Sequence, residues 1–438
     1  MNQLPPNWTQ AKFMHVFEIH GGKQPPKSMF RYEPQPGYIQ LLQIRDFGEN
    51  PVPTYIPDEK NLRKCTEQDI LIARYGASLG RILTGQSGAY NVAMVKVHIP
   101  EEIHRQFVYH LLNSEIFQAP LRLLSRSAQS GFNKQNLSNI DLPFPPLAEQ
   151  KRIADKLDTL LARVEACRAR LERVDVILKR FRQAVLAAAT SGELTEDWRK
   201  NKDKSKKYRL VSLAETGSDF RYGSSTKSQP SGKVPVLRMG NIQDGKLDWS
   251  NLVFSSNHDE ISKYKLSSGD VLFNRTNSPE LVGKTAVFKG EQPAIYAGYL
   301  IRIRCGSELL PDYLNYCLNS PAGQEWRWRV KSDSVSQSNI NAKKLATFQF
   351  ELPPIEEQRE IVRRVETLFD LADQLESRCR TAQTQVEYLR PSLLSKAFRG
   401  ELVPQDPNDE PASVLLERIR GKRAMQPALR KAKRTSAL

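Results

Sequence analysis

Apolar residues recur at steps of four and three positions along two long stretches of the chain, a spacing typical of a helix with one apolar stripe. The first series runs from Ile153 to Val185, and the second runs from Ile361 to Leu393. The pattern predicts two long amphipathic helices, the first over residues 146–189. At 1.5 Å per residue, that helix is about 66 Å long.

A helix cannot bury a narrow apolar stripe by itself, so we expect each helix to pack against the other. Two copies related by a twofold axis run in opposite directions, which favours an antiparallel coiled coil. A proline inside a helix bends it, so we also expect a bend at Pro391. The expected seam contains Ile153, Leu157, Leu160, Val164 and Leu171 from the first helix, and Ile361, Val365, Leu368, Leu375 and Val386 from the second.

The two helices belong to an internal repeat with an offset of 208 residues. Residues 128–195 align without a gap with residues 336–403, and 18 of the 68 pairs are identical, against about four for unrelated chains. In each copy the helix begins at Pro-Pro-x-x-Glu-Gln and ends at Gly-Glu-Leu. Proline is favourable in the first turn of a helix and glycine just past its end, so the repeated motifs mark the helix ends.

A block of short apolar runs bounded by Gly, Pro, Asn and Asp lies ahead of each helix, and such runs predict short strands. The two blocks match in outline at residues 38–47 and 234–242, at 68–82 and 269–285, and at 107–114 and 314–320, where a short helix is expected. We therefore predict an α+β protein in which two mixed α/β globules are joined by the two long helices, with an internal pseudo-twofold repeat.

These observations predict six segments. They are a first globule over 1–144, a first helix over 145–198, a basic linker over 199–209, a second globule over 210–352, a second helix with a terminal short helix over 353–420, and a basic tail over 421–438.

The charge is concentrated in two of these segments. The net charge is +16, and the linker and the tail each contribute six positive charges to it. A basic excess suits a polyanionic partner such as nucleic acid. The linker and tail either contact DNA phosphates or are simply mobile in solvent.

Several classes of function are disfavoured by missing motifs. There is no secretory signal pattern and no apolar run of about 20 residues, so we expect a cytoplasmic protein without a membrane partner. The five cysteines are scattered without a CxxC motif, which disfavours a metal site. Residues 282–285, VGKT, imitate the end of a phosphate loop, but Ser278 stands where that loop needs glycine. We expect no catalytic residue, metal or cofactor on this chain.

Two loops carry side chains suited to DNA. Arginine and asparagine can pair with base edges, while lysine and serine hold phosphates. Residues 127–134 and 335–343 are alike in both halves, which favours a scaffold or phosphate role for them. At any single position a solvated turn is an equally good explanation. The expected DNA-binding residues are Arg74, Tyr75, Ser78, Arg81, Gln129, Asn133, Lys134, Asn274, Arg275, Thr276, Asn277, Lys284, Gln337 and Asn341.

The whole arrangement resembles the specificity subunit of type I restriction-modification systems. The resemblance rests on the doubled helix motifs, the two variable blocks and the closing segment DPNDEPASVLLERI at 406–419. It implies two target recognition domains that each read half of a split DNA site, and two conserved helices that form an antiparallel coiled coil. It also implies two methyltransferase subunits, which bind S-adenosylmethionine and methylate adenine, and a restriction and translocase subunit that can join them.

The main hypothesis is therefore a non-enzymatic scaffold that reads double-stranded DNA, with the helix pair holding its two readers a fixed number of base pairs apart. One alternative is a self-sufficient DNA methyltransferase or nuclease, which the missing cofactor and metal motifs disfavour. Another is a coiled-coil adaptor that reads no DNA and gives no sequence-selective footprint.

Overall fold

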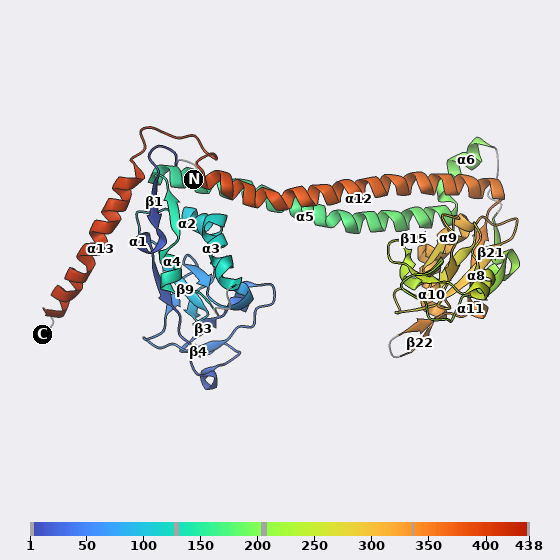
Figure 1. The fold of residues 1–438 in the computed structure, drawn as a ribbon, viewed down its shortest axis with the longest axis horizontal. Coiled ribbons are helices and arrows are strands. Elements are labelled where there is room, and N and C mark those ends of the chain that lie inside the picture. The colour runs from blue at the N-terminus through green and yellow to red at the C-terminus, as the bar shows by residue number, and fades with distance from the viewer. Residues whose placement is uncertain (1–3, 127–130, 203–207, 335–336, 436–438) are drawn as a thin grey trace. The chain divides into compact units, whose positions relative to one another are not determined.

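The computed structural model describes residues 4–126, 131–202, 208–334 and 337–435. It consists of two compact units (Figure 1). The first contains Met1–Arg170 and Ala382–Leu438, and the second contains Leu171–Thr381. Each long helix contributes one end to each unit, and the first unit is therefore built from two separate segments of the chain, whereas the second is continuous.

The first unit contains two four-stranded sheets and a strand pair. One sheet has the antiparallel order β2 (Glu18–Gly21), β9 (Met94–His98), β6 (Ile70–Ala73) and β7 (Ile82–Leu83). The other has the order β4 (Tyr55–Pro57), β3 (Tyr38–Leu42), β8 (Gly88–Tyr90) and β5 (Lys64–Cys65). The strand pair is β1 (Thr9–Lys12) with β10 (Asp141–Phe144), and the helices of this globule are α1 (Phe13–Val16), α2 (Arg105–Leu112), α3 (Glu115–Arg126) and α4 (Lys134–Ser138).

The second unit repeats this plan with one strand fewer in its second sheet and with added elements. Its four-stranded sheet has the order β12 (Gly217–Tyr222), β21 (Leu300–Cys305), β17 (Val271–Asn274) and β19 (Thr285–Val287). Its three-stranded sheet has the order β16 (Val253–Ser255), β13 (Val234–Leu237) and β20 (Ile295–Tyr296). Two strand pairs are β11 (Arg209–Ser212) with β24 (Gln349–Leu352) and β14 (Ile242–Gln243) with β15 (Lys246–Leu247). A small sheet has the order β18 (Thr276–Asn277), β23 (Ser338–Asn339) and β22 (Ser332–Asp333). The helices of this globule are α7 (Leu213–Thr216), α8 (His258–Tyr264), α9 (Pro311–Asn319), α10 (Pro321–Val330) and α11 (Ala342–Ala346).

The two globules share a topology as well as an outline. Each has one parallel strand pair, β3 with β8 and β13 with β20, in which Leu42 and Leu237 stand opposite Tyr90 and Tyr296. These tyrosines are fully buried in both cores. The predicted correspondences of 38–47 with 234–242, of 68–82 with 269–285 and of 107–114 with 314–320 are confirmed, because each pair forms matching elements.

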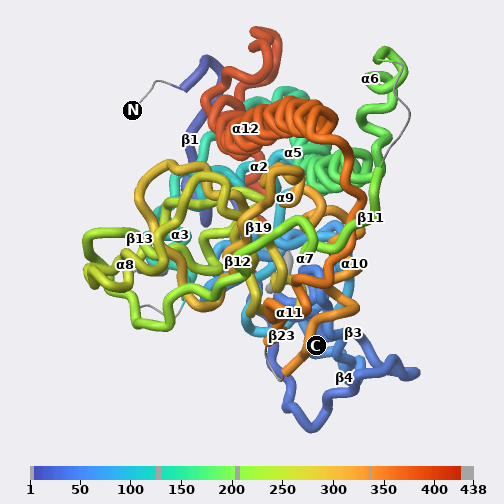
Figure 2. The backbone as a smooth tube through the Cα atoms, turned by 90° about the vertical axis from the view of Figure 1, so that its right-hand side faces the viewer, coloured from blue at the N-terminus to red at the C-terminus, as the bar shows by residue number. Residues whose placement is uncertain are grey.

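The long helices α5 (Leu147–Ser191) and α12 (Ile355–Phe398) lie side by side (Figure 1 and Figure 2). In the first unit, Ile153 near the start of α5 shares a core with Ala397 near the end of α12. In the second unit, Val185 near the end of α5 shares a core with Ile361 near the start of α12. The helices therefore pack antiparallel within each unit, as predicted, and α12 stays helical through Pro391.

The predicted apolar seam is partly correct. Ile153, Leu157, Ile361 and Val365 are fully buried, and Leu160, Val164, Leu171, Leu368 and Val386 are partly buried. Leu375 was placed wrongly, because its side chain is 41% exposed. A straight α-helix drifts by about 20° per heptad from a strict seven-residue repeat, so a position two heptads after Ile361 turns away from the facing helix.

The carboxyl-terminal segment differs from the prediction of a short helix followed by a separate tail. Helix α13 runs from Ala412 to Thr435 and includes most of the basic tail. Lys422 forms an ion pair with Glu102, and the Arg423 guanidinium donates to the backbone oxygen of His15 at 2.9 Å. Both side chains therefore bind residues of the first unit. Across the described residues, none of the helices has the length and apolarity needed to cross a bilayer.

Candidate nucleic-acid interface

In the first unit, the loop after β6 lies beside the segment that precedes α4. Tyr75 forms an antiparallel bridge with Gly131, and the Arg74 Nε donates to the Phe132 oxygen at 2.8 Å. A Cβ atom at Gly131 would lie 2.6 Å from the Arg74 oxygen, so only glycine allows this approach. The Arg74 guanidinium stacks over the Tyr75 ring at 5.1 Å. Two predicted DNA-binding segments thus form one surface.

The second unit joins the equivalent segments in the same manner. Thr276 and Asn277 in β18 pair with Asn339 and Ser338 in β23, and the Ile340 N–H donates to the Arg275 oxygen at 2.9 Å. The Arg275 guanidinium stacks over the ring of Tyr222 at 4.6 Å. The pairing of these two segments, which we call the loop frame, therefore occurs in both globules. The side chains on the two loop frames differ.

A second repeated feature joins each long helix to its globule, and it explains the glutamine of the Pro-Pro-x-x-Glu-Gln motif. Gln150 is fully buried; its Oε1 accepts from the His104 N–H at 3.0 Å, and its Nε2 donates to the Pro145 oxygen at 3.0 Å. Gln358 is also fully buried; its Oε1 accepts from the Leu310 N–H at 2.8 Å, and its Nε2 donates to the Pro353 oxygen at 2.8 Å.

His104 and Leu310 are the residues from which α2 and α9 begin. One amide therefore connects a globule helix to the first turn of a long helix in both units. The sequence contained the signal for this joint, which was a polar residue kept at the same place in both copies of the repeat.

The glutamate of the same motif binds the segment that follows the other long helix. The Glu149 carboxylate accepts from the Trp8 Nε1 at 3.0 Å and from the Gln405 Nε2 at 2.7 Å. The Glu357 carboxylate accepts from the Tyr208 and Thr195 hydroxyls, each at 2.7 Å. Burial raises the pKa of Glu149 above its ordinary value, although both hydrogen bonds oppose this shift.

Arg199 completes this cluster in the second unit. It forms an ion pair with Glu357 and donates to the Gly192 oxygen at 2.7 Å. The sequence placed Arg199 in the basic linker, but its side chain is buried and neutralised, so it is not available to a DNA phosphate.

A third contact between helix and globule is a buried histidine. The His110 Nε2 of α2 lies 2.7 Å from an oxygen of Asp158 on α5. Burial lowers the pKa of His110, and the neighbouring Asp158 partly opposes this effect.

The comparison with known families agrees with the repeat. The family model of the type I restriction modification DNA specificity domain matches residues 5–175 and again residues 202–383. The chain belongs to the type I specificity subunit family. The resemblance proposed from the sequence is confirmed, and so is the function of a DNA specificity subunit in a restriction-modification system.

Relatives cover this specificity subunit almost from end to end. The EcoKI specificity subunit of Escherichia coli K12 is 33% identical over 96% of this chain and 97% of its own length. The StySPI specificity subunit of Salmonella potsdam is 32% identical over 97% of both chains. The solved HsdS subunit of Thermoanaerobacter tengcongensis is 20% identical with a TM-score of 0.59, over 91% of this chain and 98% of that one, and supports the fold alone.

Asn133 and Asn341 of the specificity subunit both cap short helices. Their side-chain oxygens accept from the Asn136 N–H at 3.0 Å and the Lys344 N–H at 2.9 Å. The same residue occurs in both halves because it caps a helix in each, which is a structural role. Asn274 is fully buried, so its side chain cannot reach a base in this conformation.

For the remaining predicted DNA-binding residues, contact with DNA stays a prediction. Lys134 and Gln337 are exposed, and Ser78 and Lys284 are partly exposed. Three others form hydrogen bonds within the chain: Arg81 donates to the Phe47 oxygen at 2.7 Å, Thr276 accepts from Asn339 at 2.7 Å, and Asn277 accepts from the Ser278 N–H at 2.8 Å. Gln129 lies outside the described residues.

Proposed function

We propose that this specificity subunit reads a bipartite, asymmetric site in double-stranded DNA, and that each globule reads one half. The observation that carries the proposal is the repeated loop frame, which joins Tyr75 to Gly131 in one globule and Thr276 to Asn339 in the other. A repeated frame suits two similar sites on a duplex, as in dimers that bind palindromes. The different side chains on the two frames favour two different half-sites.

We further propose that the chain is not an enzyme by itself. In this proposal two methyltransferase subunits dock on the repeated helix surfaces and bind the S-adenosylmethionine, and restriction and translocase subunits join the complex. The doubled joints at Gln150 and Gln358 support two equivalent docking places, because each positions a long helix against its globule in the same way. The proposed site of action is the cytoplasm.

The experiment that tests the reading of half-sites is an exchange of residues 210–352 for the equivalent block of the EcoKI specificity subunit. Methylated sites are then mapped in cells that express the hybrid with its partner subunits. We expect one half of the site to change and the other half to stay the same. A change in both halves contradicts the proposal. The exposed Arg163→Ala substitution on α5 is the control, and it should leave the whole site unchanged.

The competing functions predict different outcomes. A self-sufficient methyltransferase would transfer methyl groups when the purified chain alone is incubated with DNA and S-adenosylmethionine, whereas we expect no transfer. A coiled-coil adaptor would leave no sequence-selective footprint on DNA even with its partners, whereas we expect a footprint over two separated half-sites.

A further inference from the structure

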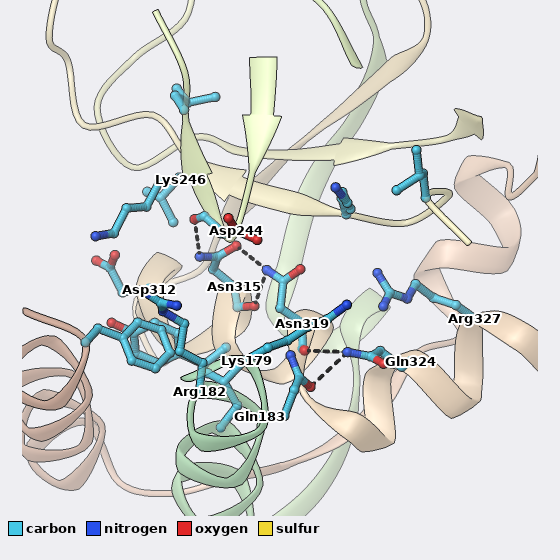
Figure 3. A pocket seen from close by; sticks show the side chains of 18 of the residues that line it. Lys179, Arg182, Gln183, Asp244, Lys246, Asp312, Asn315, Asn319, Gln324 and Arg327 are labelled. Carbon is cyan, nitrogen blue, oxygen red and sulfur yellow. Dashed lines mark hydrogen bonds between the residues drawn. The ribbon is translucent and has the colours of Figure 1, made fainter. Parts of the chain in front are cut away.

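The second unit contains a cavity of about 970 Å³ beside the end of α5 (Figure 3). Its walls come from α5, α9, α10, α12 and the loops around β14, β15 and β19. The volume lies at the upper end of the range for small-molecule sites, which is about 300 to 1,000 Å³.

Arg327 of α10 projects into this cavity without a counter-charge (Figure 3). The residue is only 9% exposed, and its guanidinium has no hydrogen-bond acceptor or ion-pair partner in the described part of the chain. Burial alone lowers its pKa to about 10, with no carboxylate contributing. A buried cation without a partner is costly, and natural proteins rarely retain one without a use.

The backbone is built around this arginine. Gly283 has a φ of 82°, and a Cβ atom there would collide with the Arg327 Cδ. Glycine at position 283 therefore allows the arginine stem to lie against the backbone, with the guanidinium held at the cavity. The next residue, Lys284, also lines the cavity.

Two lysines extend the cationic end of the cavity. Within the described chain, Lys179 has no ion-pair partner, and Lys284 has only a weak contact with the Gln243 Oε1 at 3.4 Å. Figure 3 shows Lys179 and Arg327 extending into the cavity from different helices. The other cations of the lining are neutralised by neighbouring carboxylates: Arg182 and Lys246 by Asp373, and Lys289 by Asp312.

The rest of the cavity suits an apolar or aromatic group. Leu186, Leu247, Trp249, Val282 and Phe369 line it. Burial raises the pKa of Tyr316, which also lines the cavity, and the carboxylates Asp312, Glu366 and Asp370 raise it further. None of these carboxylates contributes to the lowered pKa of Arg327, which burial alone causes.

We propose that this cavity binds a small organic phosphate of the nucleoside monophosphate class, with the phosphate at Arg327 and Lys179 and the base against the apolar wall. A guanidinium and an ammonium group that line one cavity provide charge-assisted hydrogen bonds to phosphate oxygens. Base stacking on aromatic side chains is tolerant of base identity. The inference does not rest on the proposed reading of half-sites.

Calorimetric titration of the full-length chain with AMP, adenosine and inorganic phosphate tests the proposal. We expect AMP to bind, and adenosine and inorganic phosphate each to bind at least about tenfold more weakly, since each lacks one half of the ligand. Arg327→Met keeps the stem that packs on Gly283 and should weaken AMP binding at least about tenfold. Arg329→Met is the matched control, because Arg329 is exposed on the same helix and does not line the cavity.

Lys179→Met provides a second variant whose folding is not in question, because Lys179 is exposed on α5. It should also weaken AMP binding while leaving adenosine binding unchanged. No binding of AMP, equal binding by the wild-type chain and both variants, or phosphate binding as tight as AMP overturns the proposal.

A short DNA duplex added to the titration separates this site from DNA reading. We expect the duplex to leave AMP binding unchanged. Displacement of AMP by the duplex would mean that the cavity holds a DNA phosphate, which overturns a small-molecule site. Sites of methylation in cells that express Arg327→Met should match the wild type, so the two proposals can fail independently.

Discussion

At the scale of single residues, the repeated glutamines are the clearest case of a side chain whose role depends on distant backbone. Gln150 and Gln358 each hold an N–H group at the start of a globule helix and a proline oxygen at the start of a long helix. The motif could be read from the sequence as the start of a helix. The N–H partners could not be read from it, because they lie 46 and 48 positions away along the chain.

Gln358→Ala should lower the free energy of unfolding by about 1 to 3 kcal/mol, because it leaves the part-buried Leu310 N–H without an acceptor. Gln150→Ala should have a similar effect through the His104 N–H. Chemical denaturation of the full chain measures both. Arg359→Ala, at an exposed neighbouring position, is the control. A loss as small as that of the control would show that the joint does not stabilise the fold.

His110 should make stability depend on pH. Burial lowers its pKa in the folded chain below the ordinary 6.5, so the unfolded chain takes up the proton first as the pH falls. The contribution of His110 to stability is therefore complete above pH 6.5 and is lost as the pH falls from 6.5 through the folded pKa.

Thermal unfolding between about pH 7.5 and about pH 5.5 measures this effect. His110→Gln should flatten the decline on acidification, whereas substitution of the exposed His98 by glutamine should not. An unchanged pH dependence in His110→Gln contradicts the assignment.

At the scale of elements, the Gly-Glu-Leu segments are junctions. Gly192 and Gly400 both have left-handed backbones, with φ of 83° and 76°. Their oxygens accept from Arg199 and Gln405, which also bind the glutamates at the start of the opposite long helix. The sequence predicted a helix end at each glycine, and the junction with the other helix emerged only from the structure.

Gly192→Ala should destabilise the chain by about 1 to 2 kcal/mol through the left-handed backbone alone. The new Cβ would also lie 2.7 Å from the Tyr208 hydroxyl. Thermal unfolding and amide exchange over residues 193–199 should both report the loss. Gly421→Ala is the contrasting control, because its Cβ meets nothing within 4 Å and alanine favours the surrounding helix α13. If the two substitutions lowered stability equally, Gly192 would have no special role at the junction.

At the scale of the whole molecule, α5 and α12 are the elements that belong to both units. If the helix pair fixes the distance between the two readers, its length sets the number of unread base pairs. Removal of the same heptad from each copy, residues 168–174 and 376–382, shortens each helix by about 10 Å. We expect the gap in the methylated site to shorten by about three base pairs.

Mapping of methylated sites in cells with the partner subunits measures the gap. The half-site sequences should not change, because both globules are intact. The exposed Arg180→Ala substitution on α5 should leave the gap unaltered. A gap of the original length after the double deletion would show that the helices do not set the distance between the half-sites.

The sequence by itself determined the repeat, the two long helices and the family, because periodicity and paired motifs are visible along the chain. It placed Leu375 in the seam, Arg199 in a basic linker and Asn274 on a DNA surface, and the structure revised all three environments. Only the tertiary structure decided which loops form one surface and why Glu and Gln occur twice. Burial and hydrogen-bond partners depend on segments that are distant in the chain, and local patterns do not record those contacts.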